Sequence, residues 1–342
     1  MKKHRKIQLH RYKSYDLQED IVRMKRLIGV LLIGVFIVTA FTACGVAEQS
    51  DAGINGGNEI HNISPPVPQA EAIPDYIRIR GRDISTSLTE LDVPFRLINE
   101  DIEPLRYMIN LSTLTIQFSY ISDLTPIAGL TNLTRLQINY NFYLSDITPL
   151  AGLTNLVYLS LHDNPQLSDL SPISGLTNLM ELHLFGDAIS DLTPLTGLTN
   201  LTYLSLRRSF VSDLTPLAGL ANLTFLNLHG NQINDISSLS GLTNLMGLSL
   251  SENQISILPP LFDLPNLREL NLAENSISDL APLAALTNLT VLILDDNQVS
   301  DLTPLSNLRH LMQLSVHGNF IADWSPVEQV PTIRGQTNQR RS

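Results

Sequence analysis

Cysteine is almost absent from this chain, which has a single one, Cys44, among its 342 residues. No disulfide can form within the chain, and zinc sites built on several cysteines are excluded as well. All five lysines lie within residues 1–43, and the rest of the chain has none. Charged residues make up only 16% of the chain, and aromatic residues only 6%. A domain of this composition must be held together by its apolar side chains.

Positive charge is scarce beyond the N-terminal segment. Residues 1–43 hold nine Lys or Arg and three Asp or Glu, a net charge of +6, whereas the whole chain has a formal net charge of −11. The remainder therefore has a net charge of −17. Such an acidic domain argues against nucleic acid as a partner and against lying flat on anionic lipid.

The longest apolar run is short for a membrane-spanning helix, which needs about 20 residues. It extends from Leu27 to Phe41 and follows a positively charged segment. Its length is typical of the apolar core of a signal peptide, which we predict over residues 1–43. Met24 directly precedes Lys25-Arg26 and would start a signal peptide of ordinary length. The sequence leaves open whether residues 1–23 are a long leader or precede the true start.

Small residues precede the lone cysteine in Phe41-Thr42-Ala43-Cys44-Gly45, which resembles the cleavage motif of bacterial lipoproteins. The resemblance implies cleavage before Cys44 and a lipid on its sulfur, which would anchor the protein outside the cytoplasmic membrane in the bacterial cell envelope. An uncleaved membrane anchor and ordinary secretion remain alternatives. Residues 44–73 would then comprise the lipidated cysteine and a flexible tether, spanning on the order of 30 Å.

A stretch of 22 or 23 residues repeats from Leu88 almost to the C-terminus, with LTNLTVLILDDNQVSDLTPLSN as one of its clearest copies. The first leucines of the units are Leu88, Leu111, Leu133, Leu156, Leu179, Leu201, Leu223, Leu245, Leu267, Leu289 and Leu311. A unit this short cannot bury its apolar face alone, so it must stack on its neighbours as a solenoid. The alternating x-L-x-L piece predicts a short strand, and stacked strands would pair in parallel.

Two other parts of the unit have a structural explanation. Asparagine at the ninth position predicts a ladder of amide hydrogen bonds to the backbone of its own and neighbouring turns. The Thr-Pro-Leu piece, as in Thr303-Pro304, predicts a helical turn with Thr as N-cap and Pro at the first helical position. Ile257-Leu258-Pro259-Pro260 replaces the usual Asp-Leu-x-Pro, so a different turn is expected there. The ladder asparagines are Asn141, Asn164, Asn231, Asn253, Asn275, Asn297 and Asn319.

Two recurring polar residues are given no binding role. Aspartate precedes the Thr-Pro-Leu piece of nearly every unit, which we interpret as a source of solubility. Asn-Leu-Thr and Asn-Leu-Ser triplets follow from the repeat pattern at a turn expected to be packed, so no glycosylation is assigned to them. These triplets begin at Asn110, Asn132, Asn200, Asn222 and Asn288.

The units resemble leucine-rich repeats, specifically the 22-residue bacterial type of the internalins. The resemblance implies an α/β repeat solenoid with parallel β-strands on the concave face and short 3-10 or α turns on the convex face. We predict an N-terminal cap with a partial first repeat over residues 74–110, in which 74–87 form a capping strand or hairpin. Repeats would fill residues 111–325, and a C-terminal cap remnant with a polar tail would occupy 326–342.

Side chains at the third, fifth, seventh and eighth positions of each unit point away from the core, so these positions are candidates for ligand binding. In the first two thirds of the array they include Phe118, Arg135, Tyr140, Tyr158, His162, His183, Phe185, Tyr203, Arg207, Arg208, Phe225 and His229. Exposed aromatics with arginine are typical of protein interfaces and sugar sites. In the last third the same positions hold Glu252, Glu269, Glu274, Asp295, Asp296 and His317, for which a solvated surface is favoured over a cation site.

The chain shows no constellation typical of an enzyme. The four histidines of the predicted concave face occupy different rows of the array, and no cysteine joins them, so no metal site is expected. No nucleophile motif or phosphate loop is present, and we expect no cofactor. The internalin resemblance implies a monomeric surface lipoprotein that binds a macromolecule through its concave face, a protein rather than a glycan, like an adhesin. The alternative is an envelope scaffold that binds a self partner.

Overall fold

The computed structural model describes residues 72–259 and 264–335. The chain divides into two units, Met1–Gln69 and Ala70–Ser342, and all described residues belong to the second. The predicted signal peptide, Cys44 and the tether up to residue 71 lie outside the described residues. Within the part that is described, no helix is both long and apolar enough to cross a bilayer.

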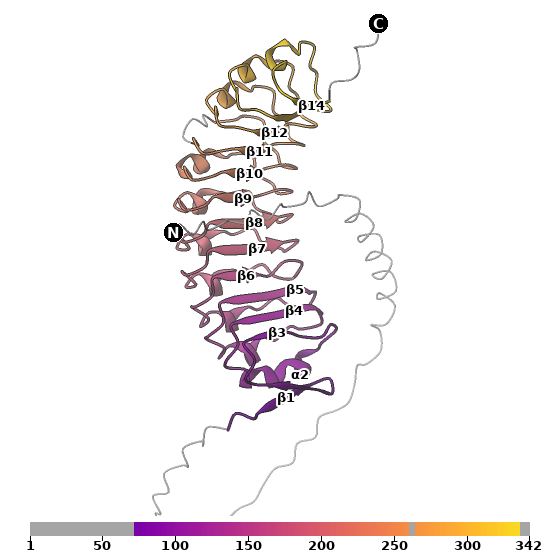
Figure 1. Cartoon of the computed structure of the whole chain (residues 1–342), viewed down its shortest axis with the longest axis vertical. Helices are drawn as coiled ribbons and strands as arrows, with labels where there is room; N and C mark the ends of the chain where they lie inside the picture. The colour runs from indigo at the N-terminus through magenta and orange to yellow at the C-terminus, as the bar shows by residue number, and fades with distance from the viewer. Residues whose placement is uncertain (1–71, 260–263, 336–342) are drawn as a thin grey trace, which may run out of the picture. The chain divides into compact units, whose positions relative to one another are not determined.

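One parallel sheet runs through the array, and its strands follow one another in sequence order (Figure 1). The strands are β3 (Glu90–Asp92), β4 (Thr113–Ser119), β5 (Arg135–Asn141), β6 (Tyr158–Ser160), β7 (Glu181–Phe185), β8 (Tyr203–Arg207), β9 (Phe225–Asn227), β10 (Gly247–Ser249), β11 (Glu269–Asn271), β12 (Val291–Ile293), β13 (Gln313–Ser315) and β14 (Thr332–Arg334). Their central leucines are in register, as Leu136, Leu159 and Leu182 show. The strand β14 pairs with β13, so the sheet continues beyond residue 325.

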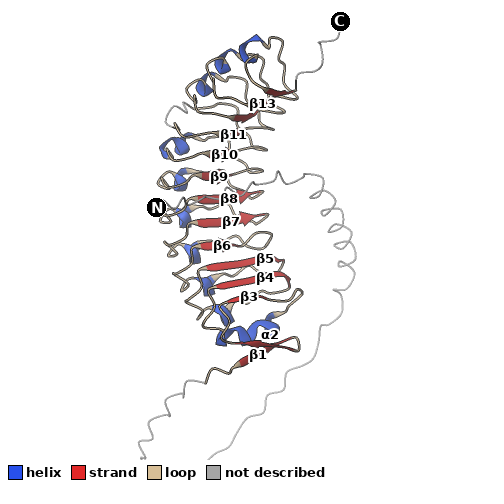
Figure 2. Cartoon of the chain, in the orientation of Figure 1, coloured by secondary structure: helices blue, strands red, loops and turns tan. Residues whose placement is uncertain are grey.

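Short helical turns lie on the side of the array opposite the strands (Figure 2). They are α2 (Asn99–Ile102), η1 (Glu103–Tyr107), η2 (Thr125–Ile127), η3 (Thr148–Leu150), η4 (Ser171–Ile173), η5 (Thr193–Leu195), η6 (Thr215–Leu217), η7 (Ser237–Gly241), η8 (Ala281–Leu283), η9 (Thr303–Leu305) and η10 (Ser325–Val327). All but α2 are 3-10 helices. The predicted α/β repeat solenoid with parallel strands and 3-10 turns is confirmed. Between η7 and η8 the described residues contain no 3-10 helix, in the repeat that carries Ile257 and Pro259.

The prediction that threonine caps each helical turn is wrong. In η6 the N-cap position belongs to Leu214, whose side chain makes no capping bond. The backbone N–H of Thr215 instead donates to Asp213 Oδ1 at 2.8 Å. The same bond recurs from Asp123 to Asp323, because an aspartate side chain readily accepts the N–H two residues on. The recurring aspartates are therefore structural, and solubility is not their only role.

Six of the seven ninth-position asparagines form the predicted ladder. The side chain of Asn141 donates only to the carbonyl oxygen of Asn139 in its own turn, and its Oδ1 has no partner among the described residues. The amide nitrogen of Asn231 donates to the carbonyl oxygens of Leu206 and Leu228, at 2.7 and 3.0 Å. Its amide oxygen accepts the N–H of Val211 at 3.1 Å. One buried side chain thus satisfies backbone groups of adjacent turns, which buried polar groups require.

A second asparagine row lies one residue before the first leucine of nine of the eleven units, where we expected a packed turn. That expectation is wrong, because these side chains are exposed. Asn200 Nδ2 donates to the carbonyl oxygen of Thr177 in the preceding repeat at 2.8 Å, and Asn222 repeats the bond to Thr199 at 2.9 Å. The row therefore ties repeats together at the surface rather than in the interior.

The leucine core is closed at its first end by an antiparallel hairpin of β1 (Tyr76–Ile79) and β2 (Arg82–Ser85). Ile77 and Ile79 of this hairpin are buried, at 4% and 0% exposure. Since the open end of a solenoid core would otherwise face water, the hairpin acts as a cap.

Candidate functional site

The side chains that leave the sheet on the side away from the leucine core form a surface that we call the strand face. All twelve binding residues predicted from the sequence lie on it, and each is half-buried or exposed. The structure brings most of the aromatic members together in two rows that cross successive strands, and Phe185 lies outside both rows beside Arg207. The arrangement follows from the parallel register, because residues at one repeat position become neighbours along the array.

One row of rings occupies the middle of the strand face and is called the central ring row: Tyr158, His183, Tyr203 and Phe225. Successive ring centroids lie 5.1, 4.7 and 5.0 Å apart, and the Tyr203 and Phe225 planes differ by only 6°. The Arg135 guanidinium carbon lies 3.4 Å from the centroid of Tyr158, at one end of the row. The faces of Tyr203 and Phe225 thus cover each other, and the Arg135 guanidinium covers one face of Tyr158.

The central ring row ends at Gly247, where a side chain would displace the ring of Phe225. A Cβ on Gly247 would lie 2.6 Å from Cδ2 of Phe225, closer than packed carbon atoms approach. Phe225 therefore occupies the space that a third-position side chain of the next repeat would need.

The second row lies at the ends of the first strands and is called the terminal ring row: Phe95, Phe118, Tyr140 and His162. Phe118 and Tyr140 stack with centroids 4.3 Å apart and planes within 8°, while Phe95 and His162 meet them edge to face. Phe118 and Tyr140 adopt positive φ angles of 50° and 59°, which non-glycine residues seldom do. The same repeat position has a positive φ in other units as well, so this backbone conformation belongs to the repeat and is not special to the rings; the other non-glycine residues are Asp163, Arg208, Glu252, Glu274 and Asp296.

Arginines and histidines surround these rings. The Arg207 guanidinium carbon lies 5.0 Å from the centroid of Phe185. His229 Nδ1 lies 2.9 Å from Ser251 Oγ, and its Nε2 lies 3.5 Å from Glu252. Burial lowers the pKa of His183 and of His229, so both imidazoles are neutral near pH 7.

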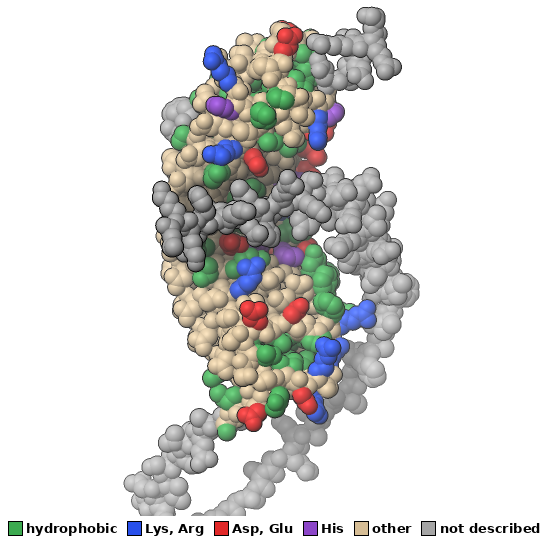
Figure 3. Space-filling model, in the orientation of Figure 1, with side chains coloured by type: hydrophobic (Ala, Val, Ile, Leu, Met, Phe, Trp, Pro, Cys, Tyr) green, Lys and Arg blue, Asp and Glu red, His purple; other side chains and the backbone are tan. Residues whose placement is uncertain are grey.

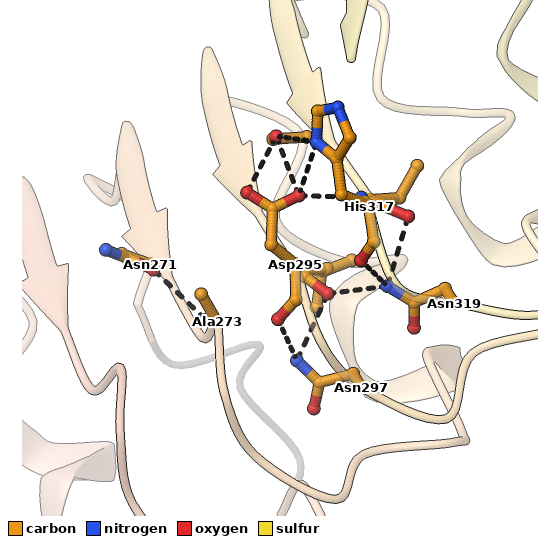
Figure 4. Close-up of polar contacts among 9 residues, drawn as sticks. Asn271, Ala273, Asp295, Asn297, His317 and Asn319 are labelled. Atoms are coloured by element: carbon orange, nitrogen blue, oxygen red, sulfur yellow. Dashed lines mark hydrogen bonds and ion pairs between the residues drawn. The ribbon is translucent and has the colours of Figure 1, made fainter. Parts of the chain in front are cut away.

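The acidic third of the strand face is partly committed to internal contacts (Figure 4). Both oxygens of Asp295 accept the hydroxyl of Ser315 at 2.8 Å, and Oδ1 also accepts the backbone N–H of His317 at 2.7 Å. Burial and the carboxylates of Glu252 and Asp296 raise the pKa of Glu274. No group of three metal-ligating side chains occurs among residues 72–259 and 264–335.

Four exposed aromatic residues were missed by sequence reasoning, namely Phe95, Tyr120, Phe142 and Tyr143. Their exposed fractions are 61, 50, 38 and 60%, and the rings of Tyr120 and Tyr143 lie 6.2 Å apart. Together with Phe118 we call these residues the aromatic edge, because they lie in or just after the strands β3, β4 and β5. Figure 3 shows hydrophobic side chains on the surface of this part of the array. The inserted residue of the 23-residue unit, at Asn141-Phe142-Tyr143, was the available signal.

A family model described as leucine rich repeats in two copies matches residues 131–175 and 243–285. No curated protein sequence matches the chain. Among solved structures, the internalin InlF of Listeria monocytogenes is 28% identical, with a TM-score of 0.54 over 74% of this chain and 89% of that one.

Two further solved structures are similar. Internalin C2 of Listeria monocytogenes is 38% identical over 49% of this chain and 75% of that chain, with a TM-score of 0.48. A leucine-rich repeat protein of Leptospira interrogans is 24% identical over 67% of this chain and 68% of that chain, with a TM-score of 0.56, a likeness of fold alone.

Proposed function

Because the chain is a leucine-rich repeat protein with internalins among its structural neighbours, we propose that it binds a protein ligand through the strand face, as an adhesin does. The observation that carries the proposal is the concentration of aromatic side chains in the two ring rows and the aromatic edge, over neighbouring repeats. Soluble proteins rarely expose connected apolar surface without a partner for it. Aromatic residues with arginine are also the residue types that dominate protein interfaces.

The geometry of the rings favours a protein over a sugar on this face. A sugar ring stacks on the flat face of an aromatic ring, but Tyr203 is stacked between His183 and Phe225, with ring centroids 4.7 and 5.0 Å away. The Arg135 guanidinium lies over the ring of Tyr158. The ring edges and the guanidinium groups of Arg135, Arg207 and Arg208 suit apolar and acidic side chains of a protein. The proposed partner therefore presents an apolar ridge with carboxylates beside it.

A second candidate function uses the same face with a partner from the cell that makes the protein. In that case the chain is an envelope scaffold, and its ligand is another envelope component. The source of the ligand separates the two functions, since the surface chemistry is the same for both.

We also propose that the protein is held at the cell envelope by a lipid on Cys44. The support is the sequence around Cys44, which resembles a lipoprotein cleavage motif after an apolar run. Changing Cys44 to Ala should release the protein from membranes into the medium or the periplasm. Membrane retention of the variant with the mass of the uncleaved chain would support an uncleaved anchor instead.

The test of the binding proposal is a crosslinking capture with the lipid-free chain, residues 45–342. Host-cell surface protein and the producer's own envelope fraction serve as separate sources. The test variant carries Tyr158→Ala, Tyr203→Ala and Arg207→Ala, and the control variant carries Val291→Ala and Gln313→Ala at equivalent strand positions outside the ring rows. Circular dichroism should show that both variants remain folded.

Three outcomes decide the question. A host protein captured by the control but lost by the test variant would establish the adhesin. A self-envelope component with the same pattern would establish the scaffold. A ligand retained by the folded test variant would remove the strand face as the binding site.

A further inference from the structure

An open groove runs along the array where the strands begin, apart from the strand face. It has a volume of about 960 Å³ and is called the edge groove. One wall is the exposed asparagine row, and the other is formed by second-position side chains of the same repeats. The lining residues are Asn132, Thr134, Asn155, Val157, Asn178, Met180, Asn200, Thr202, Asn222, Thr224, Asn244, Met246, Asn266 and Arg268.

The carboxamides of the edge groove are held in one orientation. Each donates one Nδ2 hydrogen to a carbonyl of the preceding repeat, as Asn155 does to Thr131 at 2.8 Å and Asn244 does to Ala221 at 2.9 Å. Within the described residues no other hydrogen bond engages these carboxamides, so each retains one N–H and its oxygen. Fixed donors and acceptors lose little freedom when a ligand binds, which favours affinity.

Apolar side chains interrupt the polar lining. Val157, Met180 and Met246 are 38, 45 and 42% exposed, at the position that Thr134 and Thr202 hold in other repeats. The fold does not need apolar side chains there, because threonine serves equally well in neighbouring repeats. A polar row beside apolar spots suits a ligand that has hydroxyl groups and apolar C–H faces.

The charge of the edge groove narrows the ligand class. The lining contains no carboxylate and one cation, Arg268 at its end, although the chain carries a net charge of −11. A polycation finds no counter-charge in this lining. A polyanion would meet a single arginine inside an acidic protein, which makes a neutral ligand the best match.

The spacing of the asparagines separates the remaining polymers. Adjacent strands lie about 4.8 Å apart, so the seven repeats that line the edge groove span roughly 29 Å. An extended peptide advances only about 3.3 Å per residue, so three residues span about two repeats and an equivalent peptide group meets only every second carboxamide. A pyranose ring in an extended chain advances by close to one strand spacing, so each ring can meet one carboxamide.

We propose that the edge groove binds a neutral, extended polysaccharide strand that runs along the array, one sugar ring to each repeat. The carboxamides hydrogen-bond ring hydroxyls, and the valine and methionine side chains contact the C–H faces of the rings. This site is separate from the strand face, so the protein can hold a glycan and a protein ligand together.

The test is calorimetric titration of the lipid-free chain with cellohexaose and with chitohexaose, and a heparin hexasaccharide serves as the charged control. Binding of a neutral hexasaccharide should shift the side-chain amide signals of the groove asparagines in NMR spectra. The variant with Met180→Glu and Met246→Glu should bind the neutral hexasaccharide about tenfold more weakly or worse, which corresponds to a loss of about 1.4 kcal/mol in binding free energy. The matched control is Met312→Glu, at the same repeat position outside the groove and 56% exposed. The control should bind as the unchanged chain does.

The strand-face variant of Tyr158, Tyr203 and Arg207 distinguishes this proposal from the preceding one, because it should keep its affinity for the hexasaccharide. Loss of binding in that variant would move the sugar to the strand face and overturn the edge groove as its site. Absence of binding to both neutral hexasaccharides, or equal binding by the double glutamate variant, would also overturn it. So would selective binding of an extended threonine-serine peptide in place of both sugars.

Discussion

Asp187 occupies a ladder position that asparagine holds in most repeats, and its Oδ1 accepts the backbone N–H of Asn164 at 2.8 Å. Its residue surface is only 2% exposed, and Oδ2 has no hydrogen-bond partner among the described residues. Burial raises the pKa of Asp187 to about 8. The carboxyl group is therefore mainly protonated at neutral pH. In this neutral form it resembles the asparagine amide found at the same position in most other repeats.

Replacing Asp187 by Asn should stabilise the protein, and more so at higher pH. The folded pKa lies above the ordinary value of about 3.9, so the contribution of Asp187 is complete below about pH 4 and is lost as pH rises through 8. We expect the variant to gain about 1–3 kcal/mol in unfolding free energy at pH 8 and much less at pH 5, measured by denaturant titration.

Ser209 provides the matched control, because it is another ladder position without asparagine and is 6% exposed. Ser209→Asn does not change a titrating group, so its effect should be the same at pH 5 and pH 8. An equal gain from Asp187→Asn at both pH values would contradict a protonated carboxyl group in the ladder.

The repeat pattern predicted the strands from the alternating leucines, and it predicted the ladder from the asparagine at the ninth position. Both features need only a residue type that recurs at a fixed period. The stacking of Tyr203 on Phe225 was less predictable, since it depends on the rotamers of both rings and on the glycine that follows in the next repeat. The capping role of Asp213 was hidden for a different reason. A threonine and an aspartate both stand near the start of the turn, and either side chain can accept a backbone N–H.

The capping bond of Asp213 should make the array sensitive to acid. The hydrogen bonds to Thr215 lower the pKa of the Asp213 carboxyl group, so its stabilising effect is present above the ordinary pKa of about 3.9 and is lost as pH falls through the lower folded value. Asp213→Ala should lower the melting temperature at pH 7, whereas Asp213→Asn should lower it less, because an amide oxygen can still accept the N–H. Equal melting temperatures for the unchanged chain and the alanine variant would exclude a capping role.

His183 should make the central ring row sensitive to a milder drop in pH. Burial lowers the pKa of His183, whose Nε2 lies 3.7 Å from Glu181 Oε2. Stability contributed by the neutral ring is therefore complete above about pH 6.5 and is lost as pH falls below it. His183→Phe keeps an aromatic ring between Tyr158 and Tyr203 but cannot take up a proton.

The melting temperature of the unchanged chain should fall more between pH 7 and pH 5 than that of the His183→Phe variant. His310→Gln is the control, because His310 is exposed and lies outside the central ring row. This substitution should not change the pH dependence of the melting temperature. An identical fall in all three proteins would show that protonation of the ring row does not affect folding.

Gly230 should resist substitution because a side chain there would crowd Arg208 of the preceding repeat. It has a φ angle of 72°, and a Cβ there would lie 2.8 Å from Cγ of Arg208 in the preceding repeat. Gly219 lies outside the left-handed region, and a Cβ there would meet no atom of another repeat within 4 Å, so it is the matched control. We expect Gly230→Ala to cost about 1–2 kcal/mol of unfolding free energy, whereas Gly219→Ala should change it by less than about 1 kcal/mol. Because the new Cβ would push against Arg208, the same variant should displace this side chain and weaken ligand binding at the strand face. Equal stability of the two alanine variants would contradict this prediction. It would mean that Arg208 can move aside for a side chain at position 230 without loss of unfolding free energy.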